Sequence, residues 1–229
     1  DWHEKEWSVR YGAFQQPRTA NGAASDPHFL DAWGMVTEVE HRHMAWGHPG
    51  AIRAFTFLNR ANMGNYAATL QDPSLAGDIS QTRKYRFKYG FGLNAEQELT
   101  HDVGVFARFS WNDGKNESWA FTDIDRSMSL GLSIKGTLWH RPEDTWGVAG
   151  VWNTISGGHS ALLAAGGMGI LVGDGGLSYG SERILETYYD IHIWKTIHAA
   201  LDYQFVQNPG YNRDRGPVSL FAARLHWEL

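Results

Sequence analysis

The 229-residue chain contains no cysteine, which excludes a disulfide framework and zinc–thiolate sites. It also has no apolar run close to the roughly 20 residues that a membrane-spanning helix requires. Its 20 lysines and arginines stand singly and the formal net charge is only −5, so we expect no nucleic-acid partner. No stretch has the composition of a linker, and a single domain is therefore the simplest expectation.

Aromatic residues and glycine are abundant instead. The chain holds 11 Trp, 9 Tyr, 11 Phe and 26 Gly. Trp and Tyr are enriched where a membrane meets water, and Gly serves strand bends and turns. The same composition also fits a soluble carbohydrate-binding β-sandwich rich in Trp, so the residue pattern must separate these two classes.

The clearest pattern runs from Lys84 to Glu96 and alternates strictly between two chemistries. One set comprises Tyr85, Phe87, Tyr89, Phe91, Leu93 and Ala95, and the other comprises Lys84, Arg86, Lys88, Asn94 and Glu96. A period of two is that of a β-strand. Aromatic side chains on one face and charges on the other predict a strand between lipid and an aqueous lumen, as in a transmembrane β-barrel.

The same period predicts about ten strands along the chain. They span residues 6–14, 33–44, 51–60, 83–96, 103–112, 127–139, 145–153, 183–194, 198–207 and 218–229. We therefore predict an all-β fold, an antiparallel transmembrane β-barrel.

The connections between these strands alternate in length. The short ones are 46–50, 97–102, 140–144 and 195–197, and the long ones are 15–32, 61–82, 113–126, 154–182 and 208–217. Outer-membrane barrels have short periplasmic turns and long external loops, so both ends of the chain are expected on the periplasmic side. Helical patterns at Asn65–Leu70 and Ser160–Ala165 indicate that two long loops contain helices.

Charged residues of both signs fall on the predicted inward face. The candidate pore-lining residues are Arg10, Glu38, Glu40, Arg42, Arg53, Lys84, Arg86, Lys88, Glu96, Arg108, Glu186, Asp190, His192, Asp202, Gln204 and Arg224. Facing lipid would cost about 2–4 kcal/mol for each Arg or Lys at the midplane, so this face must be wet. A lining of mixed sign suits neutral solutes rich in hydroxyl groups, although any one charge could instead pair across strands and only stiffen the wall.

Strand 51–60 has two possible phases. If Arg53 faces inward, Phe55 and Phe57 do too, and their rings would offer apolar faces on which a sugar could stack. If these phenylalanines face lipid, the strand supplies only outer surface. Periodicity alone leaves both interpretations open.

Signals for a metal or an enzyme are weak. His41 and His43 share a strand face, but the sequence supplies no third ligand, and their place beside Trp46 favours an interfacial position. Asp123 and Asp125 could hold Ca²⁺, although acidic loop residues are usually only solvated. No motif orders the Ser, His and Asn residues, so a membrane-embedded hydrolase stays an alternative without named catalytic residues. We predict no metal and no cofactor.

The final predicted strand alternates as well. Its apolar side carries Phe221, Ala223, Leu225, Trp227 and Leu229, and its polar side carries Arg224, His226 and Glu228. Apolar residues at alternate positions counted back from the last residue are similar to the assembly signal of outer-membrane proteins, which usually ends in an aromatic residue.

Several segments resemble one family, the carbohydrate-selective outer-membrane porins of the OprB type. They are Lys88–Gln97, Trp139–Asp144, Gly157–His159, Glu186–Tyr189, Asp202–Val218 and Arg224–His226. The resemblance implies passive diffusion of glucose and related sugars across the bacterial outer membrane, with small carbohydrates and membrane lipid as partners and no catalysis.

The resemblance also implies a barrel of about 16 strands, more than this chain supplies. We therefore expect residues 1–229 to form a single porin domain that is the C-terminal part of a larger barrel. Its open edges would need further strands or oligomer partners. The family's constriction is carried over only as a class, namely basic and aromatic inward positions.

Overall fold

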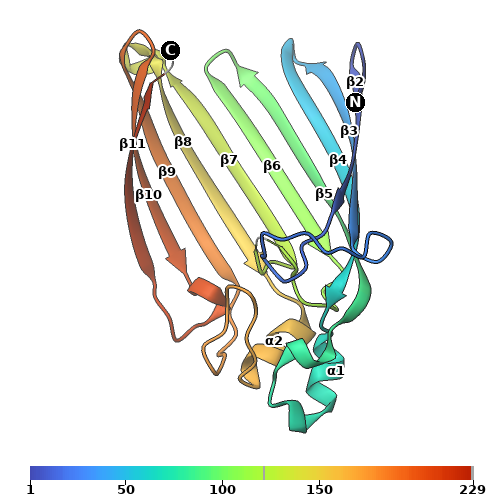
Figure 1. Cartoon of the computed structure of the whole chain (residues 1–229). Helices are drawn as coiled ribbons and strands as arrows, with labels where there is room; N and C mark the ends of the chain where they lie inside the picture. Colours follow the sequence, from blue (N-terminus) through green and yellow to red (C-terminus); the bar gives the residue numbers. More distant parts are fainter. Residues whose placement is uncertain (121, 228–229) are drawn as a thin grey trace.

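The computed structural model describes residues 1–120 and 122–227. Its strands form one 11-stranded antiparallel sheet in which neighbours in sequence are neighbours in space. The strands are β1 (Trp2–Glu4), β2 (Trp7–Gln15), β3 (Trp33–Ala45), β4 (His48–Met63), β5 (Lys84–Thr100), β6 (Val103–Asn112), β7 (Arg126–Gly136), β8 (Arg141–Thr154), β9 (Glu182–Trp194), β10 (Ile197–Gln207) and β11 (Val218–Trp227). Figure 1 shows them side by side in a curved wall. The predicted all-β antiparallel fold is confirmed.

The sheet is open within the described residues. Strand β1 pairs only with β2, and β11 pairs only with β10. All the predicted strands are present near their expected positions, while β1 was missed because three residues are too few to display a period. Glu228 and Leu229 of the last predicted strand lie outside the described residues.

The short connections are tighter than predicted. Trp46 and Gly47 have φ angles of 54° and 82°, which allows a two-residue turn, and the pairing therefore continues to Ala45 opposite His48. Strand β5 likewise runs on to Thr100.

The predicted strand 127–139 is three residues too long. Strand β7 ends at Gly136, a 3₁₀ turn follows at Thr137–Trp139, and β8 already begins at Arg141, before the predicted residue 145. Asp144 explains the early start, because its buried carboxylate accepts hydrogen bonds from Tyr189 Oη at 2.7 Å and from the backbone N–H of His192 at 3.0 Å. These bonds tie the segment to β9.

The two ends of the sheet differ. The short turns and both chain ends lie at one end, which we call the turn end, and the long loops lie at the other, the loop end (Figure 1). The first and last described residues, Asp1 and Trp227, thus lie at the end with the short turns, as the alternating connections predicted, and the periplasmic location of that end stays a prediction. No helix among the described residues is both long and apolar enough to cross a membrane.

The long loops fold into a compact loop layer, which comprises residues 64–83, 113–125 apart from 121, and 155–181. Helix α1 (Tyr66–Gln71) starts at the cap Asn65, and α2 (Gly157–Ala164) starts at the cap Ser156, whose Oγ accepts from the His159 N–H at 3.1 Å. Both predicted helices are present, although the second begins three residues earlier than expected.

Three buried apolar clusters of the described residues involve this layer. They are Ala61 with Met63 and Trp119, Tyr66 with Ile79 and Leu162, and Ile155 with Leu163 and Tyr211. The dry core therefore lies at the loop end and not inside the curve of the sheet.

Candidate functional site: the inner face of the sheet

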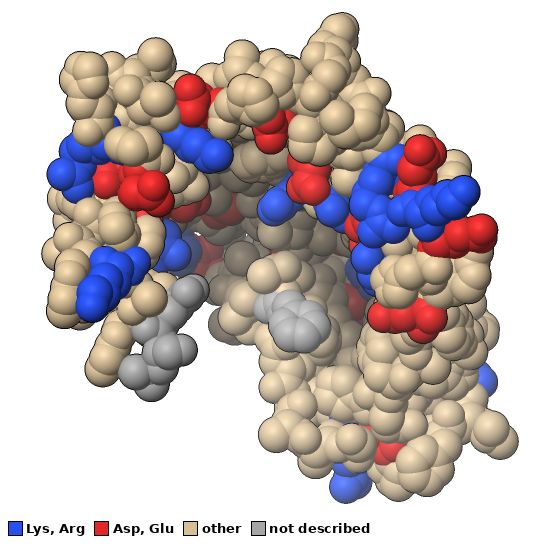
Figure 2. Space-filling view, turned by 90° about the horizontal axis from the view of Figure 1, so that it is seen from above, with Lys and Arg blue, Asp and Glu red and all other residues tan. Residues whose placement is uncertain are grey.

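The strand register puts all the predicted pore-lining residues on one face. Arg10 opposes Glu38, Glu40 opposes Arg53, and Glu186 opposes Gln204, so the polar positions of neighbouring strands coincide. Figure 2, viewed from the turn end, shows the sheet bent around a hollow with charged side chains gathered about it. We call this surface the inner face.

Glu40 is the centre of an ion-pair network on the inner face. Its buried carboxylate accepts from Arg53 Nε at 2.7 Å, from Arg10 Nη1 at 3.2 Å and from Arg42 Nη1 at 3.2 Å. Three guanidinium groups from β2, β3 and β4 thus converge on one anion. This arrangement satisfies the acid and stiffens the wall, as expected for cross-strand pairs.

The network extends over four strands. Arg10 Nη1 also donates to Glu38 Oε1 at 2.7 Å, and Arg53 Nη2 donates to Glu96 Oε1 at 2.9 Å. We call the six residues of this network the charge ladder: Arg10, Glu38, Glu40, Arg42, Arg53 and Glu96. Because its charges are paired, the ladder presents dipoles to the hollow and no strong net charge.

A second polar group lies on strands β9 to β11. Asp190 Oδ1 accepts from His198 Nδ1 at 2.7 Å, and the ring of His192 lies 5.0 Å from that of His198. Arg224 Nη2 lies 3.7 Å from Asp202 Oδ2. Glu186 and Gln204 continue the same face on adjacent strands.

The four remaining predicted cations differ in exposure. Lys84 and Arg108 are exposed, and the Arg108 guanidinium lies 4.8 Å from the centre of the Phe106 ring. Arg86 is half-buried and donates to the Thr82 carbonyl at 3.4 Å. Lys88 is buried beneath the loop layer, so sequence periodicity placed it on the correct face without revealing that it is covered.

The ambiguous phase of strand β4 is resolved. Phe55 opposes Gly92 and Phe57 opposes Gly90, and both phenylalanines share the inner face with Arg53. A Cβ atom added to either glycine would collide with the ring opposite. Each ring therefore leans across the neighbouring strand into space that a side chain would otherwise fill.

The same arrangement recurs around the inner face. The aromatic–glycine pairs are Phe14 with Gly34, Phe55 with Gly92, Phe57 with Gly90, Phe106 with Gly131, and Tyr188 with Gly147. Each pair is directly cross-strand. The rings thus lie along the wall and stay at least partly exposed, and the Phe106 ring lies beneath the Arg108 guanidinium.

A buried ionic cluster anchors the loop layer to the sheet. Asp125, 1% exposed, accepts from His159 Nδ1 at 3.1 Å and from the Ser156 N–H at 2.8 Å. Lys88 Nζ lies 3.6 Å from Asp125 Oδ1 and donates to the Asn116 carbonyl at 2.8 Å. Burial raises the pKa of Asp125, but the His159 hydrogen bond and the Lys88 charge outweigh it, and the pKa falls to about 2.

This cluster contains Ser, His and Asp but not the geometry of a hydrolase. Ser156 Oγ donates to the Gly114 carbonyl at 2.6 Å and accepts from the backbone N–H of His159, so it does not meet the imidazole ring. His159 is fully buried and stacks on Tyr66 with ring centres 4.6 Å apart. The contacts of this cluster hold the loop layer against the sheet.

The two acidic loop residues considered for Ca²⁺ are buried, so the expectation of solvated loop tips was wrong. Asp123 Oδ2 accepts from the backbone N–H groups of Leu171 at 2.8 Å and Val172 at 3.3 Å. Asp125 is bound within the ionic cluster described above. Their oxygens serve different partners and bind loop segments together.

His41 and His43 lie on the outer face near the turn end. Trp7 stacks on His41 at 4.3 Å, and the His41 and His43 rings lie 6.0 Å apart. His43 Nε2 contacts Gln97 Oε1 at 3.0 Å. The register thus puts both histidines on the face opposite the charged residues, and their place at the membrane interface stays a prediction.

An antiparallel wall with paired charges around a hollow, apolar residues outside and long loops at one end defines a β-barrel porin. A family model described as carbohydrate-selective porin, OprB family, matches residues 2–229. The chain belongs to this family, as the sequence resemblance predicted. Membership places it in the outer membrane of a Gram-negative bacterium.

A solved structure supports the fold assignment. The high-pH structure of Pseudomonas putida OprB is similar with a TM-score of 0.75 and 20% identity over 97% of this chain and 55% of that chain. At this identity the likeness concerns the fold. The chain spans about half the length of that structure. A search of curated proteins returned no match.

Proposed function

We propose that the chain forms part of a passive channel that lets glucose and related small sugars cross the outer membrane. The inner face carries what a neutral polyol needs, namely charged groups of both signs for its hydroxyls and aromatic faces for its C–H surfaces. The single observation that carries this proposal is the row of aromatic–glycine pairs beside the charge ladder. Family membership supports the choice of sugar as solute.

The mechanism we propose is exchange of hydrogen bonds without chemistry. A sugar entering the hollow gives up water and gains hydrogen bonds to the side chains of the charge ladder and to the exposed Arg108. Because the ladder charges are already paired, each contact is weak enough for the sugar to move on. We propose no enzymatic activity, because Ser156 Oγ donates to the Gly114 carbonyl and accepts from the His159 backbone N–H instead of meeting the His159 ring.

We further propose that residues 1–229 form the C-terminal part of a larger barrel. The unpaired outer edges of β1 and β11 support this, because exposed edges are not tolerated in lipid. The chain's coverage of 55% of the related structure also supports it. Further strands, outer-membrane lipid and oligomer partners would complete the assembly.

Liposome swelling by the full-length protein with a panel of mono- and disaccharides tests the function. Replacing Arg86 and Arg108 together with Ala should change the swelling rate several-fold, because both cations lie on the inner face and Arg108 is exposed. Arg126→Ala is the matched control, since this exposed arginine belongs to the outward phase of β7.

Unchanged swelling in the double variant would remove both arginines from the sugar path. If liposomes with the unmodified protein swelled at the same rate in sugars and in charged solutes of similar size, sugar selectivity itself would be contradicted.

A further inference from the structure

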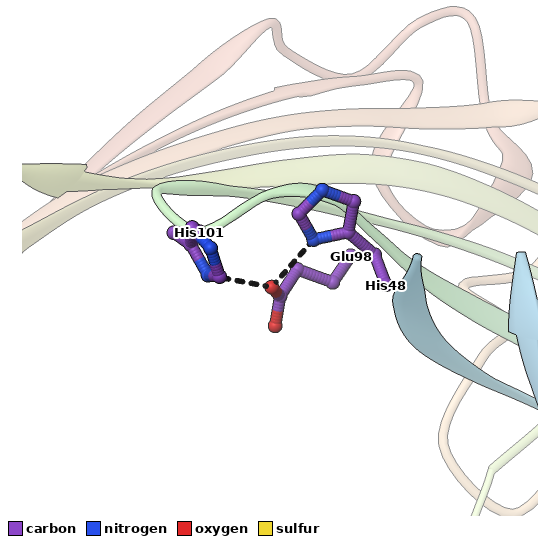
Figure 3. Close-up of side chains that lie close together, drawn as sticks. All are labelled: His48, Glu98 and His101. Carbon is purple, nitrogen blue, oxygen red and sulfur yellow. Dashed lines mark hydrogen bonds and ion pairs between the residues drawn. The ribbon is translucent and has the colours of Figure 1, made fainter. Parts of the chain in front are cut away.

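A group of metal-ligating side chains lies at the turn end, apart from the residues considered in the sequence. His48 begins β4, Glu98 lies near the end of β5, and His101 lies in the β5–β6 turn. Figure 3 shows both imidazole rings turned toward the Glu98 carboxylate. We propose that these three residues bind a divalent transition-metal ion of the Zn²⁺ type.

The distances already approach those of a metal site. Glu98 Oε1 lies 2.9 Å from His48 Nδ1 and 3.6 Å from His101 Nδ1. One ligand atom from each residue lies within 4.8 Å of the others. Bonds of about 2.0–2.1 Å in a tetrahedron put neighbouring ligand atoms about 3.3–3.4 Å apart, a value between these two distances.

The backbone that carries the ligands is held in place. Gln97 Nε2 donates to the carbonyls of His48 at 3.2 Å, Pro49 at 3.2 Å and Glu98 at 2.8 Å. Thr100 Oγ1 accepts from the backbone N–H groups at 102 and 103, at 3.2 and 3.1 Å, which fixes the turn beside His101. Binding therefore requires little more than small side-chain rotations.

The exposures fit such a rotation. The His48 side chain is 19% exposed and Glu98 is 34% exposed, whereas His101 is 93% exposed and free to turn. To bind the ion, the His48 ring must be neutral with a free lone pair on Nδ1, so its single hydrogen must lie on Nε2 and any second proton must pass to solvent. The protein would provide three ligands, leaving the fourth position to water.

The donor set selects the class of ion. Two imidazoles and one carboxylate are the ligands of Zn²⁺ and similar ions, whereas Ca²⁺ takes six to eight oxygens. Glu98 and His101 border a cavity of about 710 Å³, whose other charged residues include Glu6, Arg42 and Asp102. An ion from the solution can therefore reach the site.

Such an ion would join two turns. His48 follows the β3–β4 turn, and Glu98 with His101 flanks the β5–β6 turn, so one metal would cross-link two neighbouring hairpins of the wall. Sequence spacing could not reveal the site, because Glu98 and His48 lie 50 residues apart and meet only through the pairing of β4 with β5.

Equilibrium dialysis of the full-length protein in detergent against ZnCl₂ tests the site. We expect one Zn²⁺ per chain, and an affinity at least about tenfold lower for His101→Ala and for Glu98→Gln, since even an outer-shell partner is worth that much. His140→Asn is the matched control, because it removes an exposed turn histidine and Asn tolerates its φ of 62°.

Two results would overturn the site. One is zinc binding that is equally strong in the unmodified protein and in both ligand variants, and the other is no zinc bound by the unmodified protein. Co²⁺ in place of Zn²⁺ reports the geometry, since a four-coordinate ion absorbs strongly in the visible range. A weak, six-coordinate spectrum in the unmodified protein would contradict the proposed four-coordinate geometry.

Discussion

The loop layer and the wall follow opposite rules of burial. In the loop layer Leu162 and the ionised Asp125 are no more than 1% exposed, whereas in the wall Phe87 is 52% and Leu130 65% exposed. The difference reflects the surrounding medium, because water meets the loops while hydrocarbon meets the outer face of the strands. Large exposed apolar side chains therefore mark a lipid surface here, and buried ions mark the part that folds like a soluble protein.

The largest expected effect concerns the buried ions. Lys88→Met should lower the free energy of opening of the loop layer by about 3–5 kcal/mol, because it leaves Asp125 buried without its nearest lysine. Hydrogen exchange of the amides in residues 113–120 would measure the change. Lys84→Met, an exposed position on the same face of β5, should leave that exchange unaltered.

If exchange in Lys88→Met matched that of the unmodified protein, the buried pair would contribute nothing to the loop layer. The covered Lys88 would then contribute no more to the stability of the loop layer than the exposed residues beside it on the inner face.

The next effect tests the wall. Leu130→Arg should destabilise the protein in lipid by about 2–4 kcal/mol, because it puts a cation against hydrocarbon. The neighbouring Ser129→Arg should cost less, about 1 kcal/mol from the like charge of Arg108 directly opposite, because Ser129 lies on the hydrated inner face. Urea unfolding in liposomes would compare the two variants, and equal costs would show that the two faces do not meet different media.

A smaller effect separates the two regions by pH. The depressed pKa of Asp125, about 2 against about 3.9 in an unfolded chain, stabilises the loop layer above the unfolded value. That stability, about 2–3 kcal/mol, should disappear as the pH falls from about 4 through 2. Hydrogen exchange at a series of pH values would show it, after correction for intrinsic rates, and Asp125→Asn should lack the transition.

The wall could be predicted from the sequence because its rule is local. Period-two alternation in β5 and β6 assigns a face to each residue, and the register confirms that Asn94 and Arg108 share one. The predicted bounds of the strands beside the short turns were less accurate. They depend on the positive φ of Trp46 and on the hydrogen bonds of Asp144, which a residue pattern does not show.

The loop layer could not be predicted because its contacts join distant segments. Asp125 meets Lys88 from β5 and His159 from α2, and nothing near Asp125 in sequence announces either partner. For the same reason Lys88 looked identical to Arg86 in the alternating pattern. The aromatic–glycine pairs also depend on register, which places Gly92 opposite Phe55.

Those glycines have a consequence for the width of the passage. In each of the five aromatic–glycine pairs, the ring occupies the space that a Cβ methyl group would fill. The width of the hollow therefore depends on glycine at these five positions. Replacing Gly92 with alanine would push the Phe55 ring away from the wall and narrow the hollow without changing any charge. The width of the hollow and the charge of its lining therefore depend on different residues, so evolution can change one without changing the other.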